Sequence, residues 1–184
     1  MSGSLSGKSV MITGATAGIG LESAVGAAGE GAFVIGTGRD ENRCAAAREM
    51  ILRRVPGARV VFACANLASQ QGVRSLATQV LTLLEQDGRS SLDVLVNNAG
   101  TYCGRKTFTT DGIEKTLAVN HLAPFYLTHL LLPLIQAAPV GRVVTVSSNS
   151  HYHATLNPER VSNPLFYFGL WAYQSSKLAN VLFS

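Results

Sequence analysis

The sequence has few charged residues and few cysteines. Only 14% of its 184 residues are charged and 47% are hydrophobic, a balance that excludes an intrinsically disordered chain. Its three cysteines, Cys44, Cys64 and Cys103, include no C-x-x-C pair, and no N-x-Ser/Thr sequon is present. Both absences favour a reducing, cytoplasmic compartment over secretion.

Signals for membrane insertion and for metal binding are also scarce. The N-terminal segment lacks an apolar signal core. The longest apolar stretch, residues 117–135, contains Asn120, two histidines and two prolines, and a bilayer penalises that content. We therefore expect a buried helical region and no membrane anchor. His151 and His153 have no companion ligands, so no metal site is predicted.

The formal net charge is +4, which suits an anionic ligand such as a nucleotide phosphate. It also suits nucleic acid. However, arginines gather in and just after one predicted helix, residues 40–54, without interleaved aromatic residues. A solvated helix face explains them better, so no nucleic-acid partner is predicted.

Short β-rich runs alternate with longer helical patterns. The runs are nearly continuous in Val, Ile, Leu and Ala, which is typical of strands buried on both faces of a parallel sheet. The predicted strands are residues 8–13, 32–37, 58–64, 92–97 and 142–147. The predicted helices are residues 18–29, 40–54, 69–87 and 111–137, and a last helix begins near Trp171. The alternation predicts one α/β domain over residues 1–184, with a doubly wound parallel sheet.

A glycine-rich turn, "MITGATAGIG", joins the first predicted strand to the first helix. Its glycines follow a G-x-x-x-G-x-G spacing. Glycines there let backbone amides approach a pyrophosphate, toward which the following helix points its positive end. This context predicts a dinucleotide site. Its predicted residues are Gly14, Thr16, Ala17, Gly18, Ile19 and Gly20.

A competing phosphate motif lies upstream. "GSLSGKS" resembles a Walker A loop, but only three residues separate Gly3 from Gly7, where that motif has four. No strand precedes it, so the dinucleotide turn is the better prediction.

The end of the second predicted strand indicates which dinucleotide is bound. A carboxylate at the strand tip would bind the adenosine ribose and select NAD. This chain has Gly38 there, followed by Arg39, whose guanidinium can bind a 2′-phosphate. We therefore favour NADP(H) over NAD(H). The alternative is that Arg39 is an ordinary surface residue. Asp40 also speaks against NADP(H), unless it caps the next helix.

Five motifs follow one another along nearly the whole chain. They are "TGATAGIG" (13–20), "NNAG" (97–100), "VNH" (119–121), "VSS" (146–148) and "YQSSK" (173–177). Together they resemble the short-chain dehydrogenase/reductase family, and "AYQSSKLANVLFS" further resembles its retinol dehydrogenase-like branch. The resemblance implies a Rossmann-type sheet of strand order 3-2-1-4-5. It also implies a lipophilic small-molecule substrate, an aldehyde, ketone or alcohol.

The resemblance implies a catalytic set. Tyr173 matches the family's acid/base tyrosine, and Lys177, one helical turn later, would favour its phenolate form. Ser148 matches the serine that binds the substrate oxygen and stabilises charge on it. Ser147 would point to the opposite side of the strand, and Ser150 is a weaker candidate.

Further family roles fall on three asparagines. Asn120 matches the residue that holds a water in a proton relay. Asn97 would stabilise the central sheet and line the cofactor pocket. Asn66 stands where the family usually has aspartate and would bind the adenine amino group. The remaining cofactor contacts implied are Leu67, Ala99, Gly100, Tyr173 and Lys177.

The family's usual sixth and seventh strands have no counterpart in this sequence. Their absence is expected to expose an apolar edge beside the fifth strand. The sequence thus predicts an NADP(H)-dependent oxidoreductase that interconverts a carbonyl and an alcohol. A homo-oligomer is a possible assembly. The alternative is a catalytically deficient nucleotide-binding or interaction protein.

Overall fold

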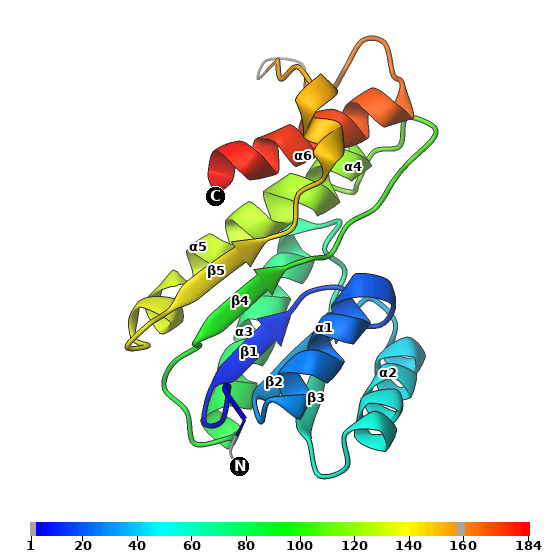
Figure 1. Ribbon diagram of the computed structural model, residues 1–184. Coiled ribbons are helices and arrows are strands. Elements are labelled where there is room, and N and C mark those ends of the chain that lie inside the picture. The colour runs from blue at the N-terminus through cyan, green and yellow to red at the C-terminus, as the bar shows by residue number, and fades with distance from the viewer. Residues whose placement is uncertain (1–2, 158–160) are drawn as a thin grey trace.

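Five strands form one sheet in the computed structural model, which describes residues 3–157 and 161–184. Every neighbouring pair is parallel, and the order is β3-β2-β1-β4-β5 (Figure 1). The strands are β1 (Ser9–Ile12), β2 (Phe33–Gly38), β3 (Arg59–Cys64), β4 (Val94–Asn97) and β5 (Arg142–Thr145). The predicted fold class and strand order are confirmed.

Helices cover both faces of the sheet (Figure 1). One face carries α1 (Gly18–Gly29) and α2 (Glu41–Arg54), and the other carries α3 (Gln70–Gln86) and α5 (Ala123–Gln136). A last helix, α6 (Gly169–Phe183), lies beyond the carboxyl ends of the strands. The shorter helical segments are α4 (Lys115–Leu117), the π-helical turn η1 (Ala118–Leu122) and the 3₁₀ turn η2 (Asn149–His153).

Each face of the sheet has its own apolar core. Leu76 and Leu84 of α3 and Leu127 of α5 are fully buried on one face. Ile51 of α2 and Val34 of β2 are fully buried on the other. The central strands are therefore buried on both sides, which explains why their sequences are almost continuously apolar.

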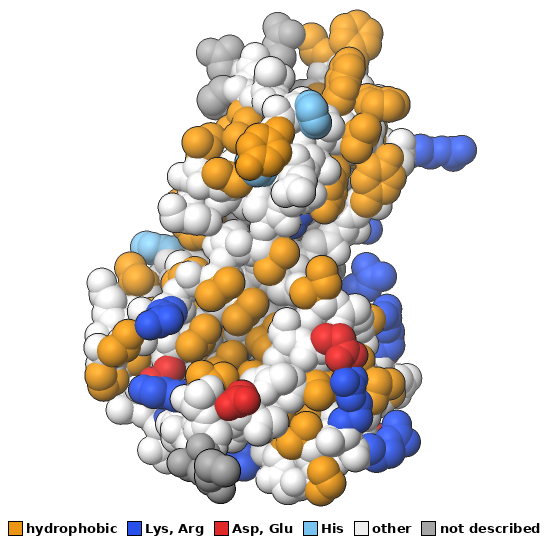
Figure 2. Space-filling model, viewed as in Figure 1, with side chains coloured by type: hydrophobic (Ala, Val, Ile, Leu, Met, Phe, Trp, Pro, Cys, Tyr) orange, Lys and Arg blue, Asp and Glu red, His pale blue; other side chains and the backbone are white. Residues whose placement is uncertain are grey.

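β5 is an exception to the prediction that the apolar runs are buried on both faces. Val143 and Val144 are 38% and 46% exposed, because β4 is the one strand that pairs with β5 among the described residues. Figure 2 shows hydrophobic side chains at the surface over this part of the sheet. The expected apolar edge beside the fifth strand is present.

The long apolar stretch forms one helical run, Lys115–Gln136, in which α4, η1 and α5 follow without a break. The predicted helix began earlier, at residue 111. By length and composition this run alone, in the described part of the chain, could cross a membrane, and 39% of its apolar window is buried. Leu127, Leu131 and Ile135 belong to the core shared with α3, so one face of this run packs inside the protein.

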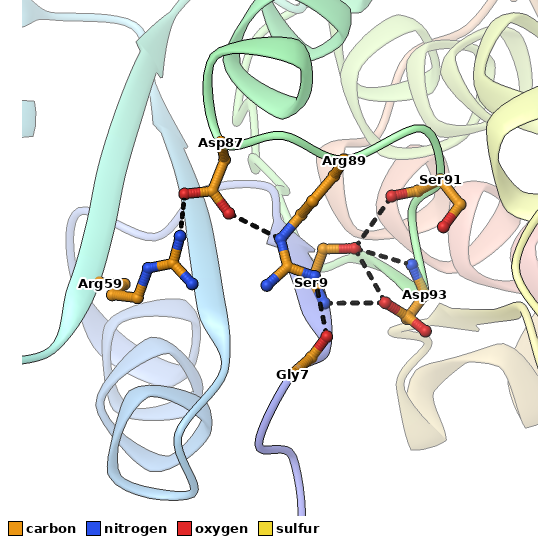
Figure 3. A network of polar contacts seen from close by, with 7 residues as sticks. All are labelled: Gly7, Ser9, Arg59, Asp87, Arg89, Ser91 and Asp93. Carbon is orange, nitrogen blue, oxygen red and sulfur yellow. Dashed lines mark hydrogen bonds and ion pairs between the residues drawn. The ribbon is translucent and has the colours of Figure 1, made fainter.

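A buried carboxylate joins β1 to β4 at the amino ends of the strands. Asp93 is 6% exposed and accepts hydrogen bonds from the Ser9 amide at 2.9 Å and from Lys8 Nζ at 2.9 Å. The Ser9 hydroxyl lies between Asp93 and the Ser91 carbonyl (Figure 3). Burial opposes ionisation, but these donors outweigh it and lower the pKa of Asp93.

Replacing this carboxylate tests its contribution to stability. Asp93→Asn should lower the free energy of unfolding at pH 7 by roughly 1–3 kcal/mol, because the buried Ser9 amide loses a charged acceptor. A lowered folded-state pKa gives stability that is present above the unfolded-state value of about 3.9 and is lost as the pH falls below it. Urea unfolding should therefore show the difference shrinking below about pH 4. A difference constant from pH 7 to pH 2 would contradict this account, and exposed Glu49→Gln is the control.

Candidate active site

A groove of about 960 Å³ runs across the carboxyl ends of the strands. In doubly wound sheets this edge binds ligands where the strand order reverses, here between β1 and β4. Most of the predicted site residues line it. They are Gly14, Thr16, Ala17, Ile19, Gly20, Arg39, Asn66, Leu67, Ala99, Gly100, Ser148, Tyr173 and Lys177.

The glycine turn leaves no room for larger residues at two positions. Gly14 has a φ of +69°, and a Cβ there would lie 3.0 Å from the Ala99 Cα. A Cβ on Gly20 would overlap the Gly14 carbonyl oxygen. Gly18, with a φ of +55°, faces open space and does not line the groove. The turn is thus closely packed against β4 on one side and open on the other, as a pyrophosphate requires.

The second asparagine of "NNAG" fastens this turn to β4. Asn98 Nδ2 donates to the Thr13 carbonyl at 2.8 Å. The Thr13 hydroxyl oxygen also accepts from the backbone amides of Asn98 and Ala99, both at 3.0 Å. Asn98 also lines the groove. Sequence analysis missed its role, although its place directly after the strand was the available signal.

Asn97, in contrast, does not line the groove as predicted. It is 3% exposed, and its Nδ2 donates to Thr128 Oγ1 of α5 at 3.0 Å. Its Oδ1 is buried without a hydrogen-bond partner among the described residues. The reason is strand alternation, because Asn97 is the last residue of β4 and points into the α5 side of the sheet.

The tip of β2 carries no carboxylate, and Gly38 there is closely packed. A Cβ on Gly38 would lie 2.5 Å from Thr16 Cγ2 and 2.6 Å from Cys44 Sγ. Arg39 is exposed at the groove, and Arg43, which was not predicted, lines it as well. Arg43 lies four residues after Arg39, which was the signal for it. Two guanidinium groups therefore border this end of the groove.

Asp40 caps the helix that follows. Its Oδ1 accepts from the Arg43 amide at 2.9 Å, at the start of α2. The carboxylate is thus engaged in helix capping, which is the explanation that the sequence left open.

Two predicted adenine contacts follow β3. Asn66 and Leu67 both line the groove. The Asn66 side-chain oxygen already accepts a hydrogen bond from the Ala68 amide at 3.0 Å. A carboxamide oxygen has a second lone pair, so it can still accept from a ligand.

Tyr173 and Lys177 lie on one face of α6. Lys177 is 4% exposed, and its Nζ lies 5.7 Å from the centre of the Tyr173 ring. The ammonium donates to the Val146 carbonyl at 2.9 Å. Burial lowers the pKa of Lys177. The helix thus presents a phenol and a buried amine at the same end of the groove.

Both Ser147 and Ser148 border the groove. The alternation argument against Ser147 was wrong, because β5 ends at Thr145 and both serines lie beyond it. They differ in hydrogen bonding. The Ser147 hydroxyl donates to the Lys177 carbonyl at 2.8 Å, whereas the Ser148 hydroxyl contacts Ser150 at 3.2 Å. Ser147 therefore fastens α6, and Ser148 contacts its own turn.

Asn120 lies behind the groove rather than in it. It is 1% exposed, and its Oδ1 accepts from the Thr101 amide at 2.7 Å. Its Nδ2 donates to the Thr101 carbonyl and to Ser176 Oγ, both at 3.0 Å. A Cβ on Gly100 would lie 3.5 Å from Asn120 Oδ1 and 3.8 Å from Lys177 Nζ. The π-helical turn that holds Asn120 is a feature often found at functional sites.

A glycine turn, a cationic rim at β2 and a Tyr/Lys pair at the far end line one groove of a doubly wound α/β sheet, at the edge where such sheets bind ligands. Comparison with known proteins shows the family of this chain. The sequence profile described as short chain dehydrogenase matches residues 8–184. The chain belongs to the short-chain dehydrogenase family.

The similar curated proteins are longer than this chain. Human dehydrogenase/reductase SDR family member 13 is 38% identical over 185 residues, covering 99% of this chain and 47% of that protein. Mouse retinol dehydrogenase 14 is 37% identical over 192 residues, covering 99% and 56%. The chain thus spans about half the length of these curated relatives. The structure of L-sorbose reductase from Gluconobacter frateurii, complexed with NADPH and L-sorbose, has a TM-score of 0.78 at 27% identity, covering 100% of this chain and 64% of that one.

Two glycines of α1 provide a matched test of the turn. Gly20→Ala should lower the free energy of unfolding by roughly 1–3 kcal/mol, since its Cβ would overlap the Gly14 carbonyl. A Cβ added at Gly26 would meet nothing within 4 Å. Gly26→Ala should therefore raise the free energy of unfolding by roughly 0.5–1 kcal/mol, because alanine has the higher helix propensity. Urea denaturation measures both. Equal effects of the two substitutions would refute the packing described for the turn.

Proposed function

We propose that this chain binds NADP(H) and catalyses the interconversion of a carbonyl and an alcohol on a lipophilic small molecule. The observation that carries the proposal is that Tyr173 and Lys177 border the same groove as the glycine turn and Ser148. The similarity to mouse retinol dehydrogenase 14, whose name gives a lipophilic alcohol as its substrate, supports a lipophilic substrate for this chain. The free thiols of Cys44, Cys64 and Cys103 fit the cytoplasmic setting proposed with it.

The groove fits a dinucleotide along its length. The glycine turn offers backbone amides and the amino end of α1 to the pyrophosphate. Arg39 and Arg43 border the side where β2 ends at Gly38 without a carboxylate. An adenosine carrying a 2′-phosphate would meet two cations there. This charge arrangement supports NADP(H) over NAD(H).

The other end of the groove suits proton transfer. When bound, the nicotinamide supplies or accepts the hydride. In reduction, Tyr173 would donate its phenolic proton to the substrate oxygen, and the Lys177 ammonium would stabilise the phenolate that remains. The Ser148 hydroxyl would donate a hydrogen bond to that oxygen as it gains negative charge. In oxidation, the phenolate would take the proton back from the alcohol.

Asn120 is proposed to act through its neighbours. Asn120 forms hydrogen bonds with Thr101 and with Ser176 of α6. Its carboxamide and Lys177 Nζ both lie next to Gly100. From there it would hold a water that passes protons between Lys177 and solvent. This role depends on the π-helical turn, which places the carboxamide inward.

Nucleotide binding without turnover is the second candidate. It is favoured by the contacts of Lys177 and Ser148, whose polar atoms bind Val146 and Ser150 within the protein. Fluorescence titration with NADPH and an assay with a panel of aliphatic and retinoid aldehydes, done on one sample, distinguish the two functions. Tight binding without any aldehyde reduction would leave only the second candidate.

Removing the phenolic oxygen tests the proton donor. Tyr173→Phe should lower kcat for aldehyde reduction by about 10²-fold or more, because the substrate oxygen loses its proton source. The Kd for NADPH should stay within about twofold, since the ring is kept. Unaltered turnover in this variant would show that another group protonates the substrate. Tyr152→Phe, on an exposed side chain outside the groove, is the control.

Neutralising Arg39 tests the cofactor preference. Arg39→Gln should raise the Kd for NADPH by about 10- to 100-fold, the loss of one charge-assisted hydrogen bond to phosphate. The Kd for NADH should hardly change, because NADH has no 2′-phosphate. The matched control is Arg53→Gln in the last turn of α2, which does not line the groove. Equal weakening of NADPH and NADH would argue against a 2′-phosphate contact.

A further inference from the structure

Cys44 and Cys64 come from two different elements and meet beside Gly38. Cys44 lies in the first turn of α2 and is 5% exposed, whereas Cys64 is the last residue of β3 and is half-buried. Both are free thiols. Their two elements lie on the opposite side of the sheet from β5 and α6 (Figure 1).

The strand register brings both side chains to the same glycine. Gly38 and Cys64 are direct partners in the ladder between β2 and β3, and partners in neighbouring parallel strands point to the same face of a sheet. A Cβ on Gly38 would lie 2.6 Å from Cys44 Sγ, so this is the face that α2 covers. Cys64 therefore projects toward Cys44 beside a residue that has no side chain.

The preceding pair in the ladder shows the same arrangement. Phe62 is the partner of Gly36, and a Cβ on Gly36 would lie 2.6 Å from the Phe62 ring. Phe62 packs against the core that contains Ile51 of α2. Because alternate residues of a strand share a face, Cys64 faces α2 as well.

Their surroundings give the two thiols different reactivities. Burial, and after it the neighbouring Cys64 side chain, raise the pKa of Cys44 to about 11. This effect of one side chain on the other shows that the two thiols interact. Cys44 stays protonated at neutral pH, and the more accessible Cys64 is the thiol that a small oxidant reaches first.

We infer that Cys44 and Cys64 form an oxidation site at which hydrogen peroxide makes a reversible disulfide. The Cys64 thiolate attacks one peroxide oxygen, the O–O bond breaks, and protonation by solvent gives a sulfenic acid and one water. The Cys44 sulfur then attacks the Cys64 sulfur, the S–O bond breaks, and the hydroxyl leaves with the Cys44 proton as a second water. Two thiols lose two electrons, and the peroxide is reduced to two waters.

The disulfide is reversible because a dithiol reductant returns both cysteines to thiols by exchange. In a reducing compartment the disulfides that form are usually transient and serve catalysis or redox sensing. The free thiols of the structure are therefore the resting state of this pair.

The disulfide would lie directly behind the cationic rim of the groove. Arg43 precedes Cys44 and lines the groove, and Ala65 follows Cys64 and lines it as well. A sulfur–sulfur bond of about 2.05 Å replaces a non-bonded contact on the order of 4 Å. The start of α2 and the end of β3 must then approach each other. If the proposed function holds, this shift moves Arg43 relative to the 2′-phosphate of NADPH.

Tryptic digestion separates the three cysteines, which makes the disulfide directly measurable. Cleavage after arginine leaves Cys44 in residues 44–48, Cys64 in residues 60–74 and Cys103 in residues 90–105. The 184-residue chain is treated with hydrogen peroxide, the remaining thiols are alkylated, and the digest is analysed by mass spectrometry without reductant. We expect the first two peptides to be linked and to separate after dithiothreitol. The Cys103 peptide should be alkylated throughout.

Single substitutions separate the two chemical steps. In Cys44→Ala, Cys64 should stop at the sulfenic acid, which a cyclic 1,3-diketone traps. In Cys64→Ser, Cys44 should stay reduced at the same peroxide concentration. The matched control, Cys103→Ser, should form the same disulfide as the unaltered chain. These results need no bound cofactor, so they are independent of the proposed function.

Fluorescence titration then tests the link to the groove. The Kd for NADPH of the oxidised chain should be higher by about threefold or more, part of the loss expected when one charge-assisted hydrogen bond to phosphate is missing. Dithiothreitol should restore the original Kd, and Cys64→Ser should not respond to peroxide. Failure of the reduced chain to bind NADPH would overturn the proposed function and leave the mapped disulfide standing.

Two results of the mapping would overturn the inference. One is oxidation of Cys64 to the sulfinic acid in the unaltered chain while Cys44 remains reduced. The other is a disulfide that contains Cys103, or one that joins two molecules, in place of the Cys44–Cys64 pair. A fully formed Cys44–Cys64 disulfide with an unaltered Kd for NADPH would overturn the link to the groove.

Discussion

The site depends on one set of hydrogen bonds, between the glycine turn after β1 and the loop after β4. The Thr13 hydroxyl oxygen accepts from the backbone amides of Asn98 and Ala99, and the Thr13 carbonyl accepts from the Asn98 side chain. These bonds fix the two loops across the point where the strand order reverses. Gly14 and Gly20 make the contact possible, because a Cβ at either position would meet a neighbouring group. The turn stays open toward solvent at Gly18, where a Cβ would meet nothing within 4 Å.

Polar contacts also place α6, the helix that carries Tyr173 and Lys177. The Val146 carbonyl accepts from Lys177 at 2.9 Å and from Asn180 at 3.4 Å. Ser147 donates to the Lys177 carbonyl, and Ser176 binds Asn120. The helix is thus held over the end of β5 by buried and partly buried hydrogen bonds on its inner face. Its position relative to the groove depends on these bonds, and each of them is costly to leave unsatisfied.

Much of this organisation could be predicted from the sequence, because parallel strands covered by helices impose continuous apolar runs and glycine turns have a fixed spacing. What failed depended on where strands end. β5 stops at Thr145, so alternation could not separate Ser147 from Ser148, and Asn97 belongs to β4 rather than to the groove. The π-helical turn around Asn120 has no signature in composition. Arg43 could have been found by its spacing from Arg39.

The central claim is that a dinucleotide lies across the carboxyl ends of these strands, from Arg39 to Tyr173. Hydrogen–deuterium exchange with and without NADPH tests it most directly. We predict protection of amides in residues 14–20 and 98–101 and at the start of α6, while the Asp93 region at the opposite ends of the strands is unchanged. Protection that falls elsewhere, or none at all at saturating NADPH, would contradict the claim.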